Sequence, residues 1–292
     1  MPPTAKPATR LGPVSLEERA FLATKERRGE RHVSQRADAE LLREHSADPY
    51  GMVHRMASKG LLIPVASGSY LIAPATGGRR LEQAAPIQLA LHARLSPYTE
   101  YFISYFSGLI EHRLTDLDES ALYAAVRGGS LREVKVAGRR VVLARITTER
   151  KWFGVETVRV GEGRRAPHYF RATLERTLLD TLDRPKLCGS PEIVVRAWER
   201  AAREKSMNVR QLVADAPRMS HSVARRAGFW LTQLKQDRAA ARLHKDLGNL
   251  SVPVLLDASK HYGDGPWPID RQWGVIVNVP EHAYAGWIGY AK

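Results

Sequence analysis

The sequence has a single cysteine and no long hydrophobic run, and each absence excludes a class of protein. Cys188 cannot form a disulfide within one chain, and no second thiol exists for a zinc knuckle or a redox pair. Apolar runs such as Val141–Ala144 are far too short to cross a bilayer. The first thirteen residues lack the apolar core of a signal peptide. We therefore expect a cytoplasmic protein that has no membrane partner.

Common catalytic and cofactor motifs are also missing. The sequence contains neither of the two glycine-rich phosphate-binding loops, no H-E-x-x-H and no G-x-S-x-G. Histidines such as His244 and His261 are isolated, without the spacing of a metal site. We therefore expect no cofactor, no resident metal and no enzymatic activity.

What the sequence has in excess is positive charge. It holds 45 Lys and Arg against 31 Asp and Glu, a formal net charge of +14 that is spread along the whole chain. Such a charge raises the encounter rate with phosphate polyanions but gives no sequence recognition. The 43% of hydrophobic residues is enough for a real core, and the length suggests about two domains.

The N-terminal part of the sequence predicts helices followed by a hairpin. Residues 1–13 hold four prolines and almost no apolar side chains, which is typical of a flexible arm. Capping signals and helical spacing predict three helices, over residues 15–29, 35–45 under a Ser34 cap, and 49–59. Strands are predicted over 61–65 and 70–73, around a glycine turn. This order is typical of a winged helix-turn-helix, which we expect over residues 14–79.

The third predicted helix is the candidate recognition element. Its inner face carries Val53, Met56 and Ala57, and no acidic residue lies between Tyr50 and Lys59. Double-stranded DNA is therefore the expected partner. The candidate DNA-binding residues are Tyr50, His54, Arg55, Ser58 and Lys59 on the helix, Ser67, Gly68 and Ser69 in the turn, and Arg79 and Arg80 after it. The alternative is a small helical subdomain with a solvated charged face.

Residues 80–292 predict a larger mixed α/β domain, beyond a hinge at Gly77-Gly78, so the expected fold class is α+β. Helices are predicted over 86–95 and 99–114. The second is aromatic, with Tyr98, Tyr101, Phe102, Tyr105 and Phe106, which we interpret as core and not as a base-stacking platform. Short strands between 121 and 171 precede helices at 173–182, 191–205, 208–214, 219–236 and 238–247, and final strands at 253–256 and 273–279.

One segment carries a family resemblance. The run Leu174-Glu175-Arg176-Thr177-Leu178-Leu179-Asp180, followed by Arg184-Pro185 and Leu187-Cys188-Gly189, resembles the AbiEi family of antitoxins and transcriptional regulators of type IV toxin–antitoxin systems. Tyr98–His112, Gly68–Leu71 and Arg271–Asn278 agree with it, so the resemblance covers residues 15–280. The family commonly has two glycines where this chain has Gly189-Ser190, which implies a slightly different turn.

The resemblance implies a division of labour between the two domains. It implies an N-terminal winged helix that binds an inverted-repeat operator upstream of its own operon and acts as an autorepressor. It also implies an antitoxin domain over 80–292 that counters a nucleotidyltransferase-like toxin without needing direct contact. From the residues alone, Arg176 and Asp180 form an i, i+4 pair on a helix, which we interpret as structural.

Two other functions remain open from the sequence. Glu133 and Lys135 form an E-x-K on a predicted strand, with Asp116 and Asp118 upstream, which resembles a metal-dependent nuclease. Alternating charges on a half-buried strand also produce this pattern by chance. The third reading is an adaptor whose basic surface binds RNA or a protein.

Overall fold

The chain forms an α+β structure with two compact units. The structure, a computed structural model, describes residues 14–72, 87–118, 121–128, 133–136, 139–160, 167–248, 250, 252–258 and 267–279. The first unit holds the described residues up to Glu100 and those of Val134–Arg140 and Thr157–Tyr169, and the second unit holds the others. The predicted arm, the predicted hinge, Arg79 and Arg80 lie outside the described residues.

The first unit begins with helices and a three-stranded sheet. Its elements are α1 (Leu16–Arg27), β1 (His32–Ser34), α2 (Ala39–His45), α3 (Pro49–Ser58), β2 (Leu62–Ala66), β3 (Ser69–Ile72) and α4 (Ile87–Leu95). The sheet has the order β1-β3-β2 and is antiparallel throughout. Its core contains Phe21, Val33, Leu42, Met52 and Met56. The three predicted helices and the hairpin are therefore present, with one additional strand.

Helix α4 extends the first unit beyond the predicted boundary at residue 79. Its apolar side chains Leu89, Leu91 and Leu95 are buried, and the helix packs on all three strands of the small sheet. Five of its nine residues are buried, so the helix is covered on more than one side. The first unit accordingly continues to Glu100.

The start of α2 differs from the prediction. Ser34 was expected to cap a helix from Gln35. Its hydroxyl accepts the N–H of Ala37 at 3.2 Å, but Ser34 ends β1, pairs with Ser69, and is followed by a turn and not by a helix. The backbone N–H of Ser34 donates to Asp38 at 2.8 Å, and the helix starts only after Asp38. Asp38 is also held by the buried Lys25, at 2.9 Å, and Lys25 bonds Glu30 as well. These contacts fix the β1–α2 connection to α1.

A six-stranded mixed sheet has the order β6-β7-β5-β4-β9-β8. Its strands are β4 (Tyr101–Ile103), β5 (Ala121–Arg127), β6 (Glu133–Val136), β7 (Arg139–Ile146), β8 (Val155–Arg159) and β9 (His168–Ala172), with a 3-10 turn, η2 (Glu149–Lys151), before β8. β4 runs antiparallel to β5 and parallel to β9.

The predicted helix over 99–114 is wrong. The segment forms β4 and then α5 (Tyr105–Glu111). Tyr101, Phe102, Tyr105 and Phe106 are all buried, as expected for core aromatics, whereas Tyr98 is 46% exposed. β-Branched and aromatic residues favour strands, and pairing of Tyr101 with Val126 across the sheet outweighs the helical spacing here.

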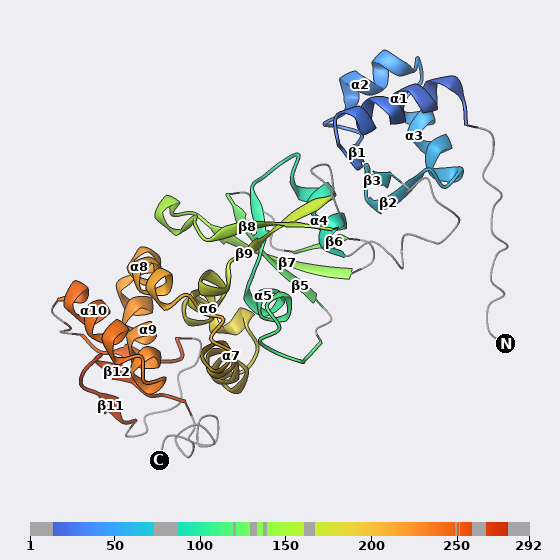
Figure 1. Cartoon of the computed structure of the whole chain (residues 1–292). Helices are drawn as coiled ribbons and strands as arrows, with labels where there is room; N and C mark the ends of the chain where they lie inside the picture. Colours follow the sequence, from blue (N-terminus) through green and yellow to red (C-terminus); the bar gives the residue numbers. More distant parts are fainter. Residues whose placement is uncertain are drawn as a thin grey trace, which may run out of the picture. The chain divides into compact units, whose positions relative to one another are not determined.

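The remaining helices belong to the second unit (Figure 1). They are α6 (Leu174–Asp183), α7 (Pro191–Arg203), α8 (Val209–Met219), α9 (His221–Gln233) and α10 (Asp237–Leu247), with a 3-10 turn, η3 (Pro185–Leu187), after α6. α8, α9 and α10 pack on one another. A small sheet of β10 (Val254–Leu255), β12 (Val275–Ile276) and β11 (Ile269–Asp270) follows, of which β11 was not predicted. Among the helices described, none has both the length and the hydropathy to cross a membrane.

Helix α9 holds the C-terminal strands through a glycine and two buried arginines. A Cβ on Gly228 would lie 2.1 Å from the Trp273 ring, so only glycine allows this approach. Arg225 donates to the carbonyls of Trp273 and Gly274, and Arg226 to those of Leu255 and Leu182. Burial lowers the pKa of both guanidinium groups. These cations serve the interior of the fold and are not available at the surface.

Helix α6, which carries the family resemblance, lies in the centre of the second unit. Arg176 and Asp180 are buried and bond at 3.0 Å. Arg176 also donates to the carbonyls of Lys151 and Phe153, and Ser104 donates its hydroxyl to Asp180 at 2.5 Å. The structural interpretation of the pair is therefore confirmed, and the pair joins α6 to the β4–α5 junction and to the loop before β8.

We expect Asp180→Ala to lower the free energy of unfolding by about 3–5 kcal/mol, because it leaves the Arg176 guanidinium buried without its carboxylate. Denaturant unfolding followed by circular dichroism measures the change. Ser104→Ala removes only one hydrogen bond to Asp180 and should cost about 1–2 kcal/mol. Arg200→Ala, which breaks exposed ion pairs with Asp116 and Glu204, is the control and should leave the midpoint unchanged. A loss in Asp180→Ala no larger than in this control would contradict the assignment.

Candidate nucleic-acid interface

Helix α3 is built as its sequence predicts. Asp48 is the N-cap and accepts the N–H of Gly51 at 2.9 Å, and Pro49 occupies the first helical position, where its missing N–H costs nothing. Met52, Val53 and Met56 are buried against the unit's core. The opposite side of the helix is therefore left for solvent or a partner.

The outer face of α3 carries four of the predicted residues. Tyr50 is 64% exposed, and His54, Arg55 and Ser58 are exposed as well. The acid nearest to them is Asp48, which lies 3.3 Å from Arg55 in an exposed pair. Such a pair is weak in water and can open when a phosphate approaches. The face therefore presents a cation, an imidazole, a hydroxyl and an aromatic ring together.

Lys59 does not belong to this face, contrary to the prediction. Its ammonium donates to both carboxylate oxygens of Glu18, at 2.9 and 2.7 Å, and the Glu18 side chain is fully buried. Ser15 completes a capping box with Glu18 at the start of α1. Burial alone would raise the pKa of Glu18, but the Lys59 ammonium and the hydrogen bonds from Ser15 together bring this pKa below its ordinary value. Lys59 therefore joins α3 to α1.

The predicted turn lies between β2 and β3, with Ser67 exposed at its tip. Gly68 has φ +69°, a conformation that favours glycine, and its carbonyl accepts the N–H of Gln35 at 2.8 Å. Ser69 is only 1% exposed, so its hydroxyl is not at the surface. Of the three turn residues, Ser67 is thus the best placed for a partner. The sequence contained no signal for the contact with Gln35.

Tyr98, which was interpreted as a core residue, is a second exposed aromatic residue of the first unit. The hydroxyls of Tyr98 and Ser34 lie 3.2 Å apart. The guanidinium groups of Arg36 and Arg94 lie 6.0 and 5.8 Å from the Tyr98 ring centre. Two cations flanking one ring are typical of a weak cation–π cluster. Arg36 follows β1, so the cluster links the end of α4 to the sheet that carries the turn.

Three histidines gather in the first unit. The ring centres of His32 and His92 lie 5.9 Å apart, and those of His92 and His168 lie 4.8 Å apart. Burial and the two neighbouring imidazoles lower the pKa of His92 to about 4, and burial lowers the pKa values of His32 and His168. In the described part of the chain, no group of three His, Cys, Asp or Glu side chains is arranged to hold a metal ion.

The predicted nuclease residues are placed on separate elements. Glu133 and Lys135 are exposed on β6. Asp116 lies in the loop after α5 and bonds Arg200 of α7 at 2.9 Å. Asp118 is exposed in the same loop.

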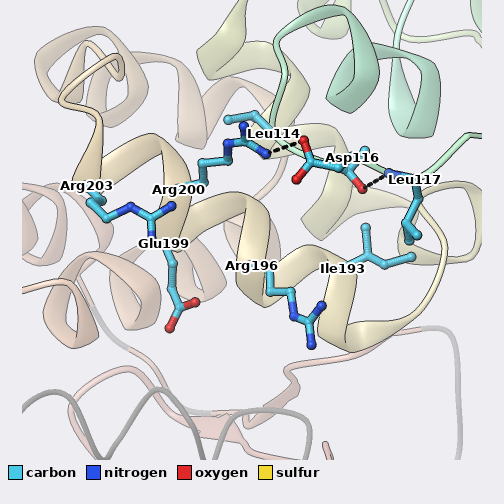
Figure 2. A pocket seen from close by; sticks show the side chains of 9 residues that line it. Leu114, Asp116, Leu117, Ile193, Arg196, Glu199, Arg200 and Arg203 are labelled. Carbon is cyan, nitrogen blue, oxygen red and sulfur yellow. Dashed lines mark hydrogen bonds and ion pairs between the residues drawn. The ribbon is translucent and has the colours of Figure 1, made fainter.

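A cavity of about 290 Å³ in the second unit lies between helix α7 and the loop that follows α5 (Figure 2). Arg196, Arg200 and Arg203 line it together with Asp116 and Glu199, and Figure 2 shows the bond between Arg200 and Asp116. Partial burial raises the pKa of Glu199, although the charges of Arg203 and Arg196 act in the opposite direction. The charges in this cavity largely compensate one another, so it is a weak anion site.

Comparison with known proteins shows similarity of fold alone. No protein-family model matches the chain, and no curated protein matches it. A solved structure, the crystal structure of the RV2827C protein from Mycobacterium tuberculosis, has a TM-score of 0.62 with this chain at 12% sequence identity. The match covers 95% of this chain and 96% of that chain. The chain thus shares the α+β fold of that protein over nearly its full length.

We expect Lys59→Met to lower the free energy of unfolding by about 1–3 kcal/mol, because Glu18 would stay buried without its cation. The matched variant on the outer face, Arg55→Gln, loses the same charge but only an exposed pair, and should leave stability unchanged. Thermal unfolding of both variants gives the comparison. Equal stability of the two would mean that Lys59 is a surface residue after all.

The histidine cluster predicts a loss of stability in mild acid. Because the pKa of folded His92 is about 4 and its ordinary value is 6.5, the unfolded chain binds more protons between these values. The contribution of His92 to the free energy of unfolding is complete above pH 6.5 and is lost as the pH drops toward 4, with a slope of up to about 1.4 kcal/mol per pH unit. Melting curves at pH 7.5, 6 and 5 measure it.

The variant His92→Gln should flatten this pH dependence between pH 6.5 and 5. His54→Gln, at an exposed position of α3, is the control and should keep the slope of the wild type. A slope in His92→Gln as steep as in the control would show that the cluster does not cause the acid sensitivity.

Proposed function

We propose that this chain is a DNA-binding transcriptional autorepressor and antitoxin of a type IV toxin–antitoxin operon. The first unit would bind an inverted-repeat operator as a winged helix-turn-helix. The second unit would counter a nucleotidyltransferase-like toxin. The observation that carries the DNA-binding part is the outer face of α3, where exposed Tyr50, His54, Arg55 and Ser58 stand together without an acidic residue among them.

The order of elements supports the proposed winged helix. A helix, a strand, two helices and a two-stranded hairpin follow one another, and the first strand closes the sheet against the hairpin. In such modules the third helix enters the major groove and the hairpin follows the backbone. Arg55 lies on α3 and Ser67 at the hairpin tip, so both proposed contact surfaces carry an exposed polar side chain. Arginine can read guanine bases and can also bind phosphates.

The antitoxin part depends on the resemblance of the Leu174–Asp180 segment to the AbiEi family. Glu175 accepts the N–H of Asn208 at 2.7 Å, and Arg176 and Asp180 pair in the core. This segment is therefore a framework element, and the surface that would counter a toxin must be formed by other residues of the second unit.

The test of the DNA-binding proposal is binding to the DNA upstream of the protein's own gene. Arg55→Gln should cost about 1–3 kcal/mol in operator binding if Arg55 reads a base, or lower the salt slope by about one if it contacts a phosphate. Gel-shift titrations at several salt concentrations distinguish the two. Arg28→Gln, at the exposed C-cap that follows α1, is the charge-matched control and should bind like the wild type.

Equal losses in Arg55→Gln and Arg28→Gln would reject α3 as the recognition helix. The antitoxin part is tested in the same variants by growth rescue, with a nucleotidyltransferase-like toxin encoded next to the gene. Rescue should survive Arg55→Gln, since the proposal assigns it to the second unit. Its loss in this variant would place both activities in the first unit.

A further inference from the structure

A wide cleft on the second unit is lined by four exposed cations that form no ion pair with a described residue. It has a volume of about 610 Å³ and lies between the start of α8 and the α9–α10 connection. Arg210 comes from α8, Lys235 from the connection, and Arg238 and Arg242 from α10. The last two stand four residues apart, so they share one face of their helix.

The four cations differ in their surroundings from the arginines that hold this unit together. Arg176, Arg225 and Arg226 are buried and bonded to backbone carbonyls or a carboxylate, and Arg200 is paired with Asp116. The four cleft cations are exposed and have no ion pair with any described residue. Asp237 is the one acid among the described residues that line the cleft. As the first residue of α10, it is placed where a negative charge stabilises the helix.

The lining fits a phosphodiester backbone better than a protein partner. In protein–protein interfaces, large apolar or aromatic side chains that fill pockets contribute most of the binding free energy. The apolar residues here are Val209, Val213 and Ala239, all small and none exposed. The cleft is open and carries three arginines and a lysine. The planar guanidinium group of arginine donates paired hydrogen bonds to phosphate oxygens, and the lysine ammonium attracts them as a compact charge. The cavity of α7, in contrast, balances three arginines with two carboxylates.

We infer that this cleft is a second nucleic-acid contact site, which binds the phosphodiester backbone through Arg210, Lys235, Arg238 and Arg242 without reading the sequence. Phosphates of duplex DNA and of RNA share this chemistry, and the experiment distinguishes the two sources. The inference does not depend on operator binding by the first unit, because all four residues lie in the second unit.

The experiment measures binding of the full chain in the Arg55→Gln background, so that the proposed recognition helix is weakened in every sample. The probes are a fluorescent duplex without the operator and a fluorescent single-stranded RNA of equal length. Arg210→Gln, Arg238→Gln and Arg242→Gln are combined in one variant. We expect its affinity to fall at least tenfold, with a salt slope lower by about 0.9 for each lost duplex phosphate contact and about 0.7 for single strands.

The control combines Arg145→Gln, Lys186→Gln and Arg271→Gln, three exposed cations of the same unit that lie outside the cleft. Loss on the duplex alone assigns the site to DNA, and loss on RNA alone assigns it to RNA. An unchanged affinity and slope for both probes, relative to the control, overturns the inference. Polyglutamate is a third probe, an anionic polymer without phosphates. A cleft variant that binds polyglutamate less tightly but binds both nucleic acids as before also overturns the inference. Failure of Arg55→Gln to affect operator binding would reject the proposed function and leave this result standing.

Discussion

The buried pair of Arg176 and Asp180 is the interaction on which the second unit depends. A guanidinium and a carboxylate in a core lose their hydration, and their attraction offsets this loss only if every remaining donor and acceptor is bonded. Lys151 and Phe153 supply the missing partners from the loop before β8, and Ser104 supplies one from the β4–α5 junction. The pair therefore needs both an arginine and an aspartate at these positions, and it also holds the neighbouring loops against α6. Replacing one partner is costly even though the pair itself stabilises the fold only modestly.

The same requirement changes what the net charge of +14 means. Arg225 and Arg226 hold the C-terminal strands through backbone carbonyls, and Lys25 is buried between two carboxylates in the first unit. Basic residues that work inside the fold add to the formal charge but offer nothing at short range to a phosphate. The cations at the surface are consequently fewer than the composition implies, and they are grouped at particular places. Their grouping, and not their number, then decides where a polyanion is held.

Most elements of the fold could be predicted from periodicity and capping, because these signals are local. The Thr173 cap of α6 and the Asp48-Pro49 start of α3 are examples. The strand at Tyr101 could not, because its conformation depends on pairing with Val126, which lies far away in the sequence. Helix α4 was predicted correctly but assigned to the second domain, since nothing in its own residues indicates that it packs on the strands of the first unit.

In the candidate site, the local sequence pattern does not determine which side chains are exposed. Arg55 and Lys59 stand one helical turn apart on α3, so periodicity places both on the outer face, yet only Arg55 is there. Lys59 stands at the C-terminal end of α3, and its long flexible stem reaches the buried carboxylate of Glu18 on another helix. A fully buried carboxylate requires a cation nearby, and that requirement arises on α1, far along the chain from Lys59. Tertiary electrostatics therefore divides two equivalent sequence positions into one that stabilises the unit and one that stays exposed on α3.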